Sequence, residues 1–191
     1  RLLYSLIFFG GLELVIANHR LTGVVFVLLL LFSLLKGREM GKRWLFCVLP
    51  IFFTASSIVL LYLITLKYEQ QVFIILATGM YYLSLLGAYR LGKYSADQTA
   101  RGMNMAAATA TIFFTYAGAY GFYLNFLVPI YFLMGAYMIV TLLVSYQDFV
   151  LLEKEQKRII WAYSFLLALI MTELIWTMNF WPFGYLTTGV I

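Results

Sequence analysis

The sequence predicts an all-α fold, a polytopic transmembrane helix bundle. Of its 191 residues, 64% are hydrophobic and 11% are charged, whereas a soluble domain is about a quarter charged and about half apolar. The apolar residues form long runs, which favours lipid as the surrounding solvent. Aromatic residues make up 19% of the chain, as is typical where Tyr and Trp collect at membrane interfaces. We therefore expect the lipid bilayer to be the first partner of this protein.

Seven apolar runs approach the length of about 20 helical residues that crosses a hydrocarbon core of about 30 Å. The first two runs are the shortest and could form one re-entrant hairpin instead of two spans. An eighth run begins near the C-terminal end, and the chain starts at Arg1, already against an apolar run. We expect one transmembrane domain over 1–191 that is a fragment of a longer chain. The predicted spans are 2–17, 21–35, 44–66, 71–91, 101–124, 126–147 and 158–181.

Basic residues are distributed unevenly between the two ends of these spans. With seven crossings, eleven of the 13 Lys and Arg residues fall on one side, and only Arg20 and Lys67 fall on the other. Short cytoplasmic loops carry the excess of positive charge in membrane proteins. A re-entrant first pair would give the same pattern, so charge orients the last five spans better than the first two. The segments expected to be cytoplasmic are the N-terminal end and the loops at 36–43, 92–100 and 148–157.

Individual spans differ in composition. The span 21–35 is uniformly apolar, and we expect it to face lipid. The span 101–124 carries Gly102, Ala106 and Ala110 at intervals of four residues, followed by Ala117 and Gly121. Small residues at this spacing let helix backbones approach closely in a membrane. We therefore expect 101–124 to lie at the centre of the bundle.

Two acidic residues, Glu13 and Glu173, lie inside apolar runs and fall toward the outer ends of their spans. A charged side chain at the bilayer centre costs about 2.5–3.5 kcal/mol on insertion scales. Two nearby acids would favour a shared proton, as in a proton-coupled site. The structural alternative is that Glu13 pairs with Arg20, while Glu173 bonds Thr177 or a tyrosine. The functional interpretation is one external polar pocket with the candidate residues Glu13, Glu173, Asn179, His19 and Arg20.

Aromatic residues could line such a pocket. Tyr116 and Tyr120 lie one helical turn apart in the span 101–124, and helical spacing brings Trp176 close to the face that carries Glu173. A tyrosine-lined cavity could hold a sugar or an aromatic ligand. Buried tyrosines more often find one hydrogen bond each and pack against their neighbours. We therefore favour a packing role for these tyrosines.

Two polar segments lie on the side expected to be cytoplasmic. The loop "KGREMGKR", 36–43, could bind a phosphate or a lipid head group, because Lys and Arg beside a membrane gain about 1 kcal/mol each near anionic lipid. Its alternative role is a tight turn that obeys the charge rule. The segment 147–158 mixes acidic and basic residues, and we expect a solvated helix end or a docking surface there. The candidate residues for anionic lipid are Lys36, Arg38, Lys42 and Arg43.

Common catalytic and cofactor motifs are absent from the sequence. One histidine and one cysteine give little basis for a metal site, and neither H-E-x-x-H nor G-x-S-x-G occurs. We expect no metal and no cofactor. The net charge of +5 comes from short loops at one membrane face, so we expect no nucleic-acid partner either.

Two classes of function remain. The favoured class is a non-catalytic structural, assembly or binding subunit, whose partners are other membrane subunits or further copies of the chain. The alternative is a transporter, or an enzyme that acts on lipid-linked substrates through Glu13 and Glu173, with Glu173 as the general base. A transporter needs a water path to both acids, whereas a scaffold needs each acid paired and dry.

Overall fold

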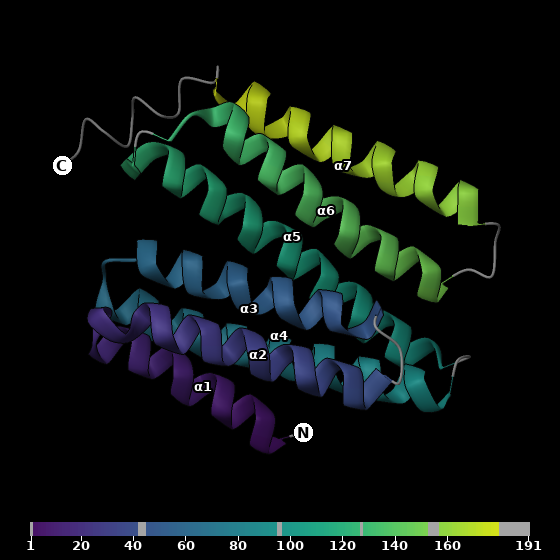
Figure 1. Ribbon diagram of the computed structural model, residues 1–191, viewed down its shortest axis with the longest axis horizontal. Helices are drawn as coiled ribbons and strands as arrows, with labels where there is room; N and C mark the ends of the chain where they lie inside the picture. Colours follow the sequence, from purple (N-terminus) through teal and green to yellow (C-terminus); the bar gives the residue numbers. More distant parts are fainter. Residues whose placement is uncertain (1, 42–44, 95–96, 127, 153–156, 180–191) are drawn as a thin grey trace.

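Seven α-helices and one short 3₁₀ turn make up the described part of the chain, which contains no strand (Figure 1). The computed structural model describes residues 2–41, 45–94, 97–126, 128–152 and 157–179. The seven predicted helices are confirmed, and the largest change is at the second, which continues to Gly41. The elements are α1 Leu2–Ala17, η1 His19–Leu21, α2 Thr22–Gly41, α3 Leu45–Leu63, α4 Lys67–Lys93, α5 Gln98–Phe126, α6 Ile130–Leu152 and α7 Lys157–Asn179.

Four of these helices, α3, α4, α6 and α7, are long and apolar enough to cross a membrane, as judged over the described residues. Helix α1 and the segment Thr22–Leu35 of α2 are apolar but shorter. Helix α5 has 29 residues and many small or polar side chains. Length and composition thus support membrane association for four helices.

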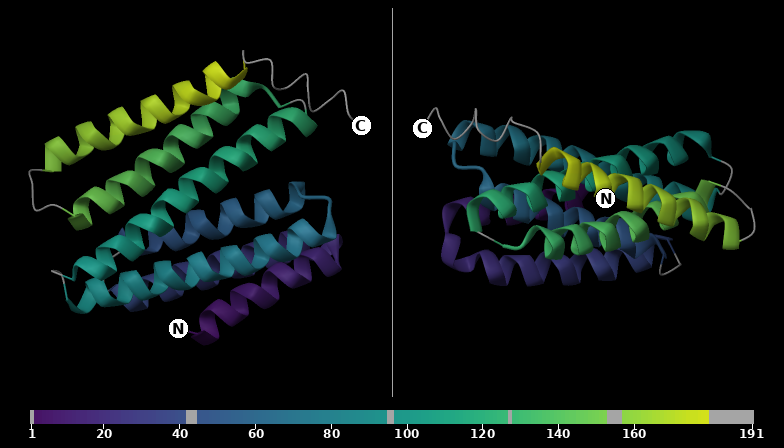
Figure 2. Two further views of the ribbon diagram at one scale, coloured as in Figure 1. Left: turned by 180° about the vertical axis from the view of Figure 1, so that it is seen from behind. Right: turned by 90° about the horizontal axis from the view of Figure 1, so that it is seen from above.

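Consecutive helices run in opposite directions, so their ends gather at the two ends of the bundle (Figures 1 and 2). Helix α5 packs against α3, α4 and α6, and its predicted central position is confirmed. Helix α7 packs chiefly on α6, whereas α1 packs on α4 and α2. Helices α1 and α7 consequently lie at opposite sides of the molecule (Figure 1).

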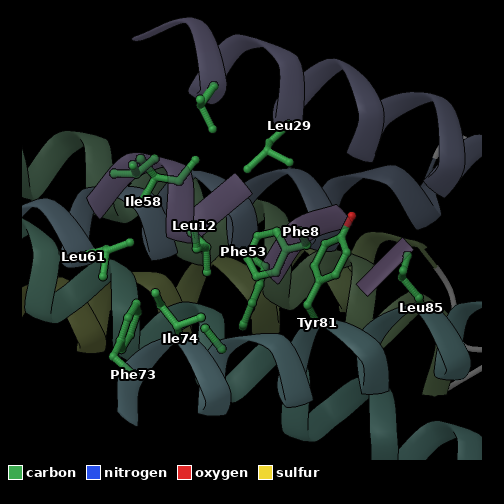
Figure 3. Packing of buried hydrophobic residues seen from close by; sticks show 13 residues of the cluster. Phe8, Leu12, Leu29, Phe53, Ile58, Leu61, Phe73, Ile74, Tyr81 and Leu85 are labelled. Carbon is green, nitrogen blue, oxygen red and sulfur yellow. The ribbon is translucent and has the colours of Figure 1, made fainter. Parts of the chain in front are cut away.

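The largest cluster of buried side chains lies among α1, α2, α3 and α4 (Figure 3). Phe8 of α1 stacks on Tyr81 of α4, with ring centroids 4.3 Å apart and ring planes 16° apart. Phe53 of α3 lies 6.2 Å from the first ring and 6.1 Å from the second. All three side chains are fully buried. Contacts between these rings therefore hold α1 against α3 and α4.

A chain of hydrogen bonds crosses this cluster from α4 through α2 to α3. The Tyr81 hydroxyl and the Thr54 hydroxyl each lie 2.9 Å from Ser33 Oγ, and Thr54 Oγ1 lies 2.8 Å from the Pro50 carbonyl oxygen. A carbonyl only accepts, and each hydroxyl has one proton. Thr54 therefore donates to Pro50, Ser33 donates to Thr54, and Tyr81 donates to Ser33. Every hydroxyl proton in this buried chain has an acceptor.

The uniform apolarity of α2 suggested a helix that faces lipid on every side. In the structure, one side of α2 is buried instead. Val25, Leu29 and Ser33 lie on one buried stripe, because α2 packs on α3 and α4. Val24, Leu28 and Leu31 remain exposed on the other side. Composition alone could not separate the two faces, because both are apolar.

The close-packed face of α5 also differs from the predicted one. Gly102 and Ala106 are exposed, and nothing lies within 4 Å of the position that a Cβ at Gly102 would occupy. The close approach occurs instead at Gly87 of α4, where a Cβ would lie 3.2 Å from both the Ala100 carbonyl oxygen and the Asn104 amide nitrogen. Helix α5 has small residues on more than one face, so the prediction is wrong for Gly102 and Ala106. It holds at Gly121, where a Cβ would lie 2.6 Å from Leu63 Cδ1 of α3. The buried α5 residues are Ala100, Asn104, Ala107, Ala108, Thr111 and Gly118.

Candidate functional site

The structure does not bring the two predicted acids together. Glu13 lies on α1 and Glu173 lies on α7, and these helices are at opposite sides of the bundle (Figure 1). The single pocket predicted to hold both acids is therefore not formed, and this prediction is corrected. Charge and helix direction gave the depth of each acid along its helix, but they carried no information about which helices are neighbours.

The environment of Glu13 differs from both sequence-based alternatives. Its Oε2 atom accepts a hydrogen bond of 3.3 Å from Gln71 Nε2 of α4, so it does not depend on Arg20. The Arg20 side chain is exposed, and its backbone N–H donates to Asn18 Oδ1 at 3.1 Å. His19 begins η1 and Asn179 ends α7, while their side chains lie outside the described part. Glu13 therefore helps to join α1 to α4.

Glu173 is exposed on α7, and within the described residues its carboxylate has no hydrogen bond or ion pair. The Thr177 hydroxyl donates to the Leu174 carbonyl at 3.0 Å, so the predicted bond to Glu173 is not made. A helix packed chiefly on one neighbour leaves much of its surface uncovered, and Glu173 lies on that surface. This acid accordingly has no partner among the side chains of the described bundle.

Glu173 belongs to a continuous exposed face of α7, which we call the α7 seam. Its members recur at alternating intervals of four and three residues, which places them on one side of a helix. The opposite side of α7, including Ser164 and Ala168, is buried, in keeping with its packing on α6. At 1.5 Å per residue the seam is about 27 Å long. The α7 seam consists of Ile159, Tyr163, Leu166, Ile170, Glu173 and Thr177.

An apolar groove of about 400 Å³ runs beside this seam, between α5 and α7. Its volume falls in the range of about 300–1,000 Å³ that is typical of ligand pockets. Phe113 forms part of the α5 wall and is 66% exposed. We call it the α5–α7 groove, and its lining residues are Thr109, Ile112, Phe113, Tyr116, Leu167, Met171 and Leu174.

The predicted aromatic lining is only partly brought to this surface. Tyr116 lines the groove and stacks on Tyr120, with centroids 6.4 Å apart and planes 3° apart. It also meets Tyr137 of α6 edge-on at 6.1 Å. Trp176 is about half exposed on α7. The rings of Tyr116 and Tyr120 thus pack against one another, which agrees with the favoured packing role.

A buried polar cluster joins α6 to α5 and α3, and the sequence did not suggest it. Asn104 Nδ2 donates to Asp148 Oδ1 at 2.8 Å, and the Leu49 backbone N–H donates to Gln147 Oε1 at 2.8 Å. We call Asn104, Gln147 and Asp148 the polar cluster. Hydrogen bonds between helices are a common means of holding membrane bundles together. This geometry gives the cluster a role in fixing α6 in place.

The prediction of a solvated helix end is wrong at Gln147 and Asp148. Their exposed fractions are 1% and 9%, while residues 153–156 of that segment lie outside the described residues. A usable signal was present in the sequence, because Tyr137, Thr141 and Val144 precede Asp148 at intervals of four, three and four residues. All three are buried, and they mark the face of α6 that continues to Asp148.

Most of the candidate lipid-binding loop lies outside the described residues. Lys36 and Arg38 fall within α2, although their side chains, like the whole of Lys42 and Arg43, lie outside the described residues. Among the described residues, no group of three or more His, Cys, Asp or Glu side chains could hold a metal ion.

These features define a helical protein with four helices able to cross a membrane and one exposed helix face that carries an acid. Residues 32–191 match the family model described as "Protein of unknown function (DUF5656)", so the chain belongs to the DUF5656 family. No curated protein and no solved structure matches it. The match includes all of α3 to α7, and with them the α7 seam and the polar cluster. Helix α1 with Glu13 precedes it.

Proposed function

We propose that this chain is a seven-span membrane protein and that it serves as a non-catalytic assembly or binding subunit, which binds another membrane protein through the α7 seam. The observation that carries this proposal is the seam itself, a helix-long exposed face with an acid that has no partner among the described residues and lies among apolar side chains. Apolar side chains alone suit contact with lipid, but an ionisable residue within a membrane span normally pairs with another group or faces the interior of the protein.

The proposal of seven spans requires that α1, α2 and α5 also cross the membrane. Helix α5 is covered on part of its surface by α3, α4 and α6, and this contact buries several of its small residues, among them Ala107, Ala108 and Thr111. Helix α1 has 16 residues, or about 24 Å at 1.5 Å per residue, and the apolar segment Thr22–Leu35 of α2 is about 21 Å long. Local thinning of the bilayer accommodates a span that is a few residues short.

The orientation follows from the charges at the two ends of the bundle. One end carries five described basic residues, and the other carries Arg20 and Lys67. By the positive-inside rule the first end is cytoplasmic. The end with η1 and the last turn of α7 then faces outward, which puts Glu173 in the outer half of the membrane. The five basic residues are Arg90, Lys93, Arg101, Lys157 and Arg158.

A binding role is favoured over transport or catalysis by the surroundings of the acids. The transport interpretation requires a water path to both Glu13 and Glu173, and the two residues lie on helices at opposite sides of the bundle. The α5–α7 groove is lined mainly by apolar side chains, which suit contact with another helix. Asp148 is engaged with Asn104 inside the protein.

A photo-crosslinking amino acid at Ile170 of the α7 seam tests this role in the protein's native membrane. We expect one protein adduct of defined mass, because Ile170 is 46% exposed at the middle of the seam. The control position is Ile75 on α4, which is 64% exposed and lies far from the seam in sequence. The measurement is the mass of the adducts after illumination. Lipid adducts alone at both positions would contradict a protein partner on the seam.

A further inference from the structure

Glu173 lies too deep along α7 to be served by the water at the helix end. It is six residues before the last helical residue, or about 9 Å along the axis at 1.5 Å per residue. The side chain is short, and its carboxylate points away from the face that packs on α6. Acyl chains offer no hydrogen bond, so a lipid in the α5–α7 groove would leave the charge unpaired. The occupant of this face therefore has to bring a polar group with it.

A second copy of the chain does not offer a suitable group at that depth. The basic residues at the outer end are Arg20 in η1 and Lys67, the first residue of α4. Both lie at helix ends, and the remaining Lys and Arg residues belong to the opposite end or its loops. A copy in the same orientation would thus present no lysine or arginine at the depth of Glu173, and the exposed polar residues near it, such as Gln71, are uncharged.

We propose that the α7 seam binds a transmembrane helix of a different membrane protein, and that this helix carries an arginine or lysine facing Glu173. This inference rests on the proposed function and adds the chemistry of the partner. An Arg or Lys facing a carboxylate in lipid satisfies two charges that are each costly alone. The charge complementarity fixes the depth of the partner helix, because the two groups meet only in one register.

The α5–α7 groove supplies the apolar part of the same contact. Leu174 follows Glu173 directly and lines the groove, and Phe113 forms the wall on α5. A helix laid along the seam would place one row of its apolar side chains between these two residues. Glu173 thereby selects the partner's charge, and the groove selects its shape.

The test uses the full chain in lipid nanodiscs and a synthetic transmembrane peptide built mainly of leucine. One peptide carries a single Arg at the depth of Glu173, and the matched peptide carries Leu there. A donor dye on Lys157→Cys in a Cys47→Ser background reports binding of acceptor-labelled peptide by energy transfer. We expect the Arg peptide to bind at least about tenfold more tightly than the Leu peptide, since hydrogen bonds to charged groups are the stronger class.

Two variants distinguish the contribution of the Glu173 charge from that of the groove's shape, and a third variant is the control. Glu173→Gln is expected to remove the preference for the Arg peptide, whereas Glu69→Gln, at an exposed acid in the first turn of α4, leaves it intact. Phe113→Ala is expected to weaken both peptides together, because it removes a groove wall and no charge. These three results jointly support pairing at Glu173 within the seam.

Other outcomes would overturn the inference. Equal binding of the two peptides, or an Arg preference that survives in Glu173→Gln, would show that Glu173 does not select a cation. Energy transfer between two labelled copies without peptide, lost in Glu173→Gln, would identify a second copy as the occupant. If the crosslink at Ile170 still forms while the peptides bind equally, the proposed function stands and the basic partner is wrong.

Discussion

Replacing Tyr81 with alanine is expected to lower the free energy of unfolding by about 3–5 kcal/mol, the range found for deleting a large buried aromatic side chain. The ring is fully buried and stacks on Phe8, so its loss opens a cavity among α1, α3 and α4. Dispersion contacts are lost in a membrane as they are in water. The measurement is unfolding of the purified chain in mixed micelles as the fraction of denaturing detergent rises.

Tyr81→Phe serves as the matched variant because it keeps the ring and removes only the hydroxyl. Ser33 would then lose the donor at the start of the chain that runs to Thr54 and Pro50. We expect a cost of about 0.5–1.5 kcal/mol. Tyr68→Ala, at a residue that is 81% exposed, should change little. If Tyr81→Phe were as damaging as Tyr81→Ala, the hydroxyl chain and not the aromatic stack would be the main support of this region.

Replacing Asp148 with leucine is expected to cost about 1–3 kcal/mol, the penalty for leaving a buried hydrogen-bonding group without its partner. Asn104 is 1% exposed and donates to Asp148 at 2.8 Å. With leucine at 148, the Asn104 amide group loses the acceptor that it now has. The same detergent titration measures the effect.

A double-mutant cycle distinguishes the pair from its surroundings. Asn104→Leu alone should also be destabilising, since it leaves the Asp148 carboxylate buried without that donor. The double variant, with leucine at both positions, should be more stable than the sum of the single effects predicts, because no orphaned group remains. Strictly additive effects would contradict a direct coupling between α5 and α6 through these two side chains.

Hydropathy was sufficient to find the helices and much weaker at placing their ends. In a chain this hydrophobic, a run of about 20 apolar residues has few alternatives to a helix. The end of α6 shows the limit: the helix was expected to continue past the predicted span that stops at 147, and it does, to Leu152, but its first polar residues were expected to be solvated. Gln147 and Asp148 are buried by contacts with α3 and α5. Such contacts depend on neighbours that are distant in sequence.

The sequence was also unable to predict which helices of the candidate site are neighbours. The sequence correctly singled out Glu173 as an acid in an apolar helix, but it grouped this residue with Glu13 on depth alone. Which face of α7 is covered depends on the packing of α6 and α7, since apolar residues occur all round α7. The α7 seam is defined by the exposure of its residues, which depends on that packing and not on hydropathy.

A nitroxide scan of residues 159–177 in lipid bilayers, made in a Cys47→Ser background, tests the outward-facing seam most directly. The quantity measured is the accessibility of each spin label to oxygen and to a water-soluble nickel complex. We expect oxygen maxima at Leu166 and Ile170, minima at Ser164 and Ala168, and little access of nickel to Leu166 or Ile170. Oxygen maxima at Ser164 and Ala168, or nickel access at Leu166 equal to that at Lys157, would contradict a seam that faces the membrane interior.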